Sequence, residues 1–120
     1  MTAPNTKKRP AFLTLTRIHF PVMAVLSLGH RLSGVLLVLS IPLLAYLFDR
    51  SLASAEGYAG VSALLRGDGA RVALLLMVWA FAHHLLAGVR FLLIDLDVGV
   101  TLRPARASAW AVLIGGVLAM

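Results

Sequence analysis

Cysteine is absent from this chain of 120 residues, which excludes disulfide bonds, cysteine-ligated iron–sulfur clusters and thioether-attached haem. Acidic residues are also scarce, with five Asp and Glu against eleven Lys and Arg. Charged residues make up 13% of the sequence, whereas a soluble domain usually carries about 25%. The chain therefore lacks the polar surface that a soluble domain of this size needs.

Apolar residues dominate instead. They make up 60% of the sequence, and the mean hydropathy is +0.91. This composition predicts an all-α membrane protein with three transmembrane helices at about 20–48, 72–95 and 104–120. The third is the shortest apolar segment. The polar loop of residues 49–71 has room for a short interfacial helix around residues 54–65.

The basic residues indicate how the chain is oriented. A net charge of +6 would also suit a nucleic-acid binder, but four of the basic residues precede the first apolar segment, which favours a membrane flank. By the positive-inside rule we expect residues 1–19 to form a cytoplasmic N-terminal tail. Residues 20–120 are expected to form a single transmembrane domain. No nucleic-acid partner is expected, and membrane lipids surround the helices.

The stretch of residues 27–34, which reads Ser-Leu-Gly-His-Arg-Leu-Ser-Gly, places charge inside the first apolar segment. An ionisable group at membrane depth is costly and persists only with a partner or a function. On a helix, Ser27, His30, Arg31 and Gly34 fall at i, i+3, i+4 and i+7, so they lie on one face. This face gathers the polar side chains of the segment.

A second polar site lies on the second apolar segment. His30 is ten residues after Phe20, and His84 is ten residues before Ile94. At about 1.5 Å per residue, antiparallel helices would hold both histidines about 15 Å from the same membrane face. His83 points about 100° away from His84 on a helix, so the two cannot ligate one metal from one side.

These side chains suit a haem or quinone pocket, or both. An imidazole in a dry cavity is a good axial ligand for haem iron, arginine pairs with carboxylates such as propionates, and a serine hydroxyl can bind a quinone carbonyl. A membrane histidine also often serves only as a hydrogen-bonding group between helices. Arg90, about a turn from the end of its helix, is expected to anchor at the interface.

Two motifs resemble the family of cytochrome b556 subunits of succinate dehydrogenase. The resemblance covers nearly the whole chain and includes the same three-helix order. The matching residues are Arg9-Pro10, 18–21, 27–34, and the segment His-Leu-Leu-Ala-Gly-Val-Arg at 84–90 followed by Asp95. Many relatives carry a histidine directly after this arginine, where this chain has Phe91.

The resemblance implies a membrane anchor in the bacterial inner membrane. This anchor forms a heterodimeric bundle with a second small membrane-anchor subunit, and the pair holds the iron–sulfur subunit and the flavoprotein subunit. One haem b lies between the anchors, with His84 as one axial ligand and a partner histidine as the other. His30 and Arg31 lie near the haem propionates, Ser27 and Arg31 border the ubiquinone site, and Asp95 supports that site. Electrons from succinate, a tricarboxylic acid cycle intermediate, would reach ubiquinone here.

Several alternatives stay open on the sequence. The related fumarate reductase anchors run the chemistry backwards, and catalysis belongs to the assembled complex because this chain alone has no flavin or succinate site. A haem-free structural anchor is a second reading. A small transporter subunit is a third, although neither main apolar segment contains the acidic residue that proton coupling usually needs. Ligation of one haem by both His30 and His84 is a fourth, ranked below partner ligation.

Overall fold

The structure, a computed structural model, describes residues 20–120. These residues form four α-helices and no strand. The helices are α1 (Val22–Ala53), α2 (Ala55–Arg66), α3 (Asp68–Asp95) and α4 (Leu102–Leu118). The expected tail of residues 1–19 lies outside the described residues.

The helix ends follow local chemistry more than hydropathy. α1 continues five residues past the expected end at residue 48, because solvated polar residues are compatible with a helix and no breaker follows until Ser54. Ser54 then caps α2, its hydroxyl accepting from the Gly57 N–H at 2.9 Å. A side chain at Gly57 would collide with the Arg50 carbonyl, so this glycine permits the sharp turn from α1 into α2.

The described residues form one helix more than the three expected transmembrane helices. The short helix expected near residues 54–65 is a full element, α2. Within residues 20–120, only α1 and α3 are long and apolar enough to qualify as candidate membrane spans. α4 has 17 residues and reaches about 26 Å at 1.5 Å per residue, against a hydrocarbon core of about 30 Å. Its crossing of the membrane stays a prediction.

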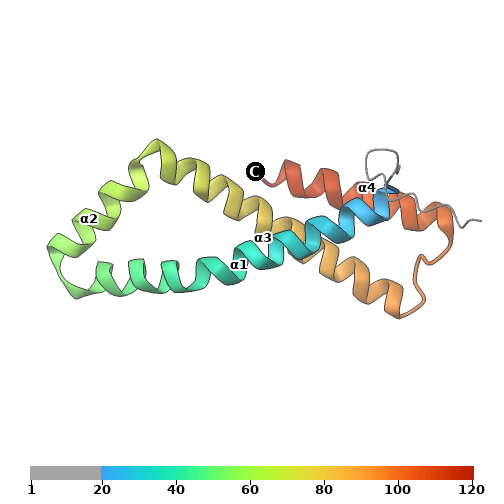
Figure 1. Cartoon of the computed structure of the whole chain (residues 1–120), viewed down its shortest axis with the longest axis horizontal. Helices are drawn as coiled ribbons and strands as arrows, with labels where there is room; N and C mark the ends of the chain where they lie inside the picture. Colours follow the sequence, from blue (N-terminus) through green and yellow to red (C-terminus); the bar gives the residue numbers. More distant parts are fainter. Residues whose placement is uncertain (1–19) are drawn as a thin grey trace, which may run out of the picture.

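α1 and α3 run antiparallel and cross near their middles, and α4 returns beside the crossing (Figure 1). The core lies where three helices meet, with Leu26 from α1, Ala87 from α3, and Ala109 and Val112 from α4. Two of the four side chains are Ala, which allows the close helix approach typical of membrane bundles. This packing holds the polar residues of α1 against those of α3.

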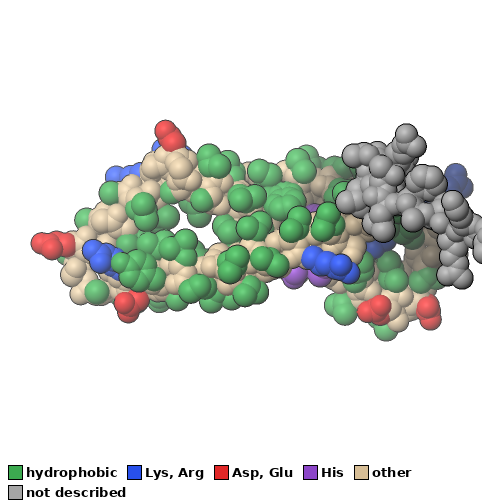
Figure 2. Space-filling view, in the orientation of Figure 1, with side chains coloured by type: hydrophobic (Ala, Val, Ile, Leu, Met, Phe, Trp, Pro, Cys, Tyr) green, Lys and Arg blue, Asp and Glu red, His purple; other side chains and the backbone are tan. Residues whose placement is uncertain are grey.

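Large apolar side chains cover the outside of the bundle. Val38 and Leu39, for example, are 65% and 67% exposed. Figure 2 shows such side chains along the middle of the visible face, while most charged side chains gather toward the two ends. Soluble monomers rarely expose apolar surface of this extent, and the separation of apolar middle from charged ends matches the profile of a bilayer.

Candidate functional site

His30 of α1 and His84 of α3 are in direct contact. Their rings stack with centroids 4.1 Å apart and planes inclined by 12°. The prediction that the two histidines lie at one level, made from helix rise and antiparallel packing, is confirmed. Phe91 contacts the His30 ring edge-on, with centroids 5.2 Å apart, and closes the stack on the side toward the end of α3.

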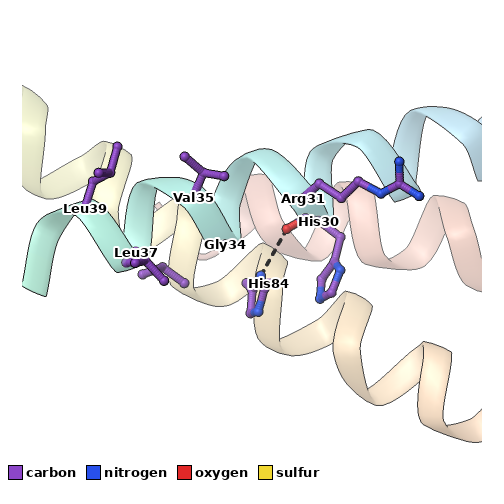
Figure 3. A pocket seen from close by; sticks show the side chains of 8 residues that line it. His30, Arg31, Gly34, Val35, Leu37, Leu39 and His84 are labelled. Carbon is purple, nitrogen blue, oxygen red and sulfur yellow. Dashed lines mark hydrogen bonds between the residues drawn. The ribbon is translucent and has the colours of Figure 1, made fainter.

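The hydrogen bond of His84 defines its chemistry. Its Nδ1 lies 3.1 Å from the backbone carbonyl oxygen of His30 (Figure 3). A carbonyl oxygen only accepts, so the proton of this bond is on Nδ1. In a neutral imidazole the other nitrogen, Nε2, then carries a lone pair. Metal-ligating histidines commonly have this arrangement, with the far nitrogen donating to a carbonyl or carboxylate.

Each of the two histidine rings packs against a glycine of the facing helix, which leaves space for the ring. A Cβ built on Gly34 of α1 would lie 2.9 Å from His84 Cε1, closer than real Cβ contacts allow. Gly88 of α3 faces His30 Nε2, where an added Cβ would be at an ordinary 3.7 Å. Gly34 is therefore required for the close approach of α3, whereas Gly88 is only permissive.

An open groove of about 640 Å³ lies beside the two histidines, within the size range of cofactor sites. Arg31 extends along α1 toward its N-terminal end, and the groove wall beyond the histidines is aliphatic (Figure 3). The groove thus combines an imidazole nitrogen, apolar walls and one cation at its edge. Its lining residues are His30, Arg31, Gly34, Val35, Leu37, Val38, Leu39 and His84.

The neighbouring histidine, His83, faces the opposite way. Its side chain is 1% exposed, and neither ring nitrogen has a hydrogen-bond partner in the described chain. It stacks on Trp79 with centroids 5.2 Å apart, and it lies between Gly29 of α1 and Gly116 of α4. The expectation that the two adjacent histidines point apart is confirmed, and only His84 reaches the groove.

The site does not match a multi-ligand metal centre. Within residues 20–120, no three His, Asp or Glu side chains come together as metal ligands would. A structural zinc site needs four such ligands. An imidazole nitrogen at an apolar groove instead fits axial ligation of a metal whose other ligands belong to a cofactor or a partner.

Arg90 is buried, contrary to its expected role as an interface anchor. Its Nε donates to Ser108 Oγ at 2.9 Å, and its Nη2 donates to the Ala105 carbonyl oxygen at 3.0 Å. The side chain is 6% exposed and its guanidinium carbon lies 5.6 Å from the centre of the Phe91 ring. The prediction that Arg90 anchors at the interface is wrong, because α4 folds back over this side chain. Arg90 instead joins α3 to α4.

Comparison with known proteins now gives the family. The profile described as "Succinate dehydrogenase/Fumarate reductase transmembrane subunit" matches residues 5–120. The chain belongs to this family. It is 42% identical over 114 residues to the succinate dehydrogenase cytochrome b556 subunit of Coxiella burnetii, covering 94% of this chain and 91% of that protein.

Two more distant relatives carry the same name. The cytochrome b556 subunit of Paracoccus denitrificans is 29% identical over 118 residues, covering 98% of this chain and 91% of that protein. The subunit of Rickettsia bellii is 28% identical over 113 residues, covering 92% and 86%. The family is a transmembrane one, which agrees with the two candidate spans and the apolar exterior.

The residues expected to serve a succinate dehydrogenase anchor fall into two groups. His30, Arg31 and His84 line one groove. Ser27 and Asp95 are not among its lining residues: Ser27 is half-buried one turn earlier on α1, and Asp95 is exposed at the last position of α3. α1 is helical through this stretch, so Ser27 keeps the same face of α1 as His30 and Arg31 but lies outside the groove.

Sequence reasoning missed Ser33, which is fully buried and contacts His84. A signal was present, because Ser33 lies three residues after His30, where a serine hydroxyl can reach the carbonyl of the preceding turn.

Proposed function

We propose that this chain is the cytochrome b membrane anchor of a succinate dehydrogenase and binds a b-type haem through His84. The observation that carries the proposal is the Nδ1 hydrogen bond of His84, a residue that lines the groove, because this bond leaves Nε2 with a lone pair for a metal. The name of the relatives, cytochrome b556 subunit, supports the same cofactor.

The described residues fit a haem. The groove is walled by aliphatic side chains such as Leu37 and Leu39, which suit the apolar macrocycle. Arg31 and His30 lie at the same groove and are suited to the anionic propionates, because guanidinium groups pair with carboxylates. When bound, the haem supplies a one-electron redox centre. The chain's own part is to hold the ligand, exclude water and neutralise charge.

The second axial ligand is proposed to come from a partner anchor subunit. The two histidines of this chain stack face to face at 4.1 Å, so no macrocycle fits between them. Ligation of one haem from both sides by His30 and His84 is therefore incompatible with this packing. The groove is open rather than enclosed, which supports a heterodimeric bundle in which a partner anchor would complete the haem site.

Ubiquinone reduction is proposed to involve the N-terminal part of α1. Arg31 extends toward that end (Figure 3), and Ser27 precedes it by four residues, about one helical turn. A hydroxyl and a guanidinium one turn apart can both donate to a quinone carbonyl oxygen. Asp95 is assigned a supporting role at the same site. We place this end at the cytoplasmic face of a bacterial inner membrane, against the iron–sulfur subunit, which receives electrons from the flavoprotein subunit.

The test is a reduced-minus-oxidised optical spectrum of the purified complex for wild type, His84→Ala and His83→Leu. His83→Leu is the matched control, because it changes the adjacent histidine that faces away from the groove. We expect wild type and His83→Leu to share a low-spin b-type spectrum that His84→Ala lacks. An unchanged spectrum in His84→Ala would contradict the ligand assignment. A wild-type complex without haem would favour the structural anchor.

A further inference from the structure

A buried hydroxyl lies directly behind the proposed haem ligand. Ser33 of α1 is 0% exposed, and its Oγ is 3.3 Å from His84 Nδ1. It does not line the groove. We propose that Ser33 is a positioning residue that orients His84 and tunes how strongly its imidazole donates electrons to the haem iron. This inference rests on the proposed role of His84 as an axial ligand.

Three polar atoms form a closed triangle at this point. Ser33 Oγ donates to the His30 carbonyl oxygen at 2.9 Å, and His84 Nδ1 donates to the same oxygen at 3.1 Å. The third side is the 3.3 Å contact between Ser33 Oγ and His84 Nδ1. The triangle joins α1 to α3 at the level of the stacked histidines. His84 is therefore held from behind by two oxygens rather than one.

The His30 carbonyl oxygen is surrounded by more donors than it has lone pairs, so the Ser33 hydroxyl matters as an acceptor for the His84 Nδ1 proton. The His30 carbonyl has two lone pairs, and in an α-helix it already accepts from the N–H four residues later, at Gly34. Ser33 and His84 bring the number of nearby donors to three. The Nδ1 proton of His84 is thus shared between an overcommitted carbonyl and the lone pairs of the Ser33 hydroxyl. Ser33 is a second acceptor for this proton, because its own proton goes to the carbonyl and its lone pairs stay available.

The physical consequence reaches the proposed ligand atom. An acceptor at Nδ1–H makes an imidazole more basic, and a more basic ligand favours the oxidised, more positive metal. Two acceptors also hold the ring plane more firmly than one. Loss of the hydroxyl leaves a single carbonyl, so ligand basicity falls and the ring gains rotational freedom. The Nδ1 tautomer survives, because the His30 carbonyl remains.

The experiment measures the midpoint potential of the haem and its low-spin electron paramagnetic resonance signal in the assembled complex. The variants are Ser33→Ala and the hydroxyl-retaining Ser33→Thr. The matched control is Ser40→Ala, because Ser40 lies on the same helix and makes the same bond to the third preceding carbonyl, at Leu37 O and 2.7 Å. Ser40 lies in a different cavity, away from the histidines.

We expect Ser33→Ala to keep its haem, to raise the midpoint potential and to shift or broaden the low-spin signal. Ser33→Thr should return both readouts toward wild type, and Ser40→Ala should leave both unchanged. Equal shifts in Ser33→Ala and Ser40→Ala, or wild-type values in Ser33→Ala, would overturn the inference. So would complete loss of haem from Ser33→Ala. If His84→Ala retains the haem spectrum, the proposed function itself fails, which is a distinguishable result.

Discussion

Replacement of Gly29 by alanine should reveal how tightly α3 is held against α1. A Cβ at position 29 would lie 2.7 Å from His83 Nε2 and 3.3 Å from His83 Cε1. The ring would have to move by about 0.7 Å to restore ordinary contact. It has little room to do so, because an added Cβ on Gly116, on its other side, would already be 3.2 Å from His83 Cβ. Forced overpacking of this kind typically costs about 1–3 kcal/mol.

The expected net effect includes a gain from helix propensity. Alanine is better than glycine in a helix by about 1 kcal/mol, so the net cost of Gly29→Ala is about 0–2 kcal/mol. Without the His83 imidazole ring, Gly29→Ala should change from destabilising to stabilising. In a His83→Ala background the collision is gone, and Gly29→Ala should stabilise by up to about 1 kcal/mol. The coupling between the two positions should then be about 1–3 kcal/mol.

The assay is thermal unfolding of the detergent-purified complex, comparing midpoints of the four members of this double-mutant cycle. Gly60→Ala is the control, because Gly60 lies in helix α2 and a Cβ there would meet nothing within 4 Å. It should raise the midpoint equally in both backgrounds. If Gly29→Ala has the same effect with and without the His83 ring, the steric reasoning is refuted.

Two further predictions concern the polar residues of α1 and the contact between α3 and α4. We expect Arg31→Leu to lower quinone reduction roughly tenfold or more, since a hydrogen bond to a charged group contributes about 1.5–3 kcal/mol, and Ser27→Ala to lower it by about two- to tenfold, since a neutral hydrogen bond contributes about 0.5–1.5 kcal/mol. Succinate oxidation by an artificial acceptor should be retained in both variants. Equal loss of both activities would instead indicate an assembly defect. We expect Arg90→Leu to lower the thermal midpoint, because it removes the two hydrogen bonds that Arg90 of α3 donates to Ser108 and Ala105 of α4, and a hydrogen bond to a charged group contributes about 1.5–3 kcal/mol. An Arg90→Leu complex as stable as wild type would contradict the role of this side chain in joining α3 to α4.

Much of the fold could be predicted from residue patterns. The apolar runs predict α1 and α3, and their lengths are close to the observed ones because a membrane demands long uninterrupted apolar helices. The ends were less predictable. Hydropathy reports where a helix leaves the bilayer, whereas the helix itself continues until a cap such as Ser54 or Gly67 ends it.

The candidate site was predictable in part. The polar residues inside apolar runs identify His30, Arg31 and His84, because such groups are expensive at membrane depth. Ser33 was not identified, since serine is common in membrane helices and nothing in its pattern shows that it faces a second helix. Arg90 was misassigned because its burial depends on α4, whose path over α3 is not encoded in any local pattern.

Residue spacing alone predicts that the two histidines lie at one level. The rise of an α-helix is fixed at about 1.5 Å per residue, so residue spacing along antiparallel helices converts directly into depth. The direction in which each helix presents its side chains depends instead on how the helices pack. Rotation about a helix axis is set by packing, here by Gly29 and Gly116 around the His83 ring. That packing turns His84 toward the groove and brings its Nδ1 within hydrogen-bond distance of the His30 carbonyl oxygen. Residue spacing along the helices does not predict this orientation.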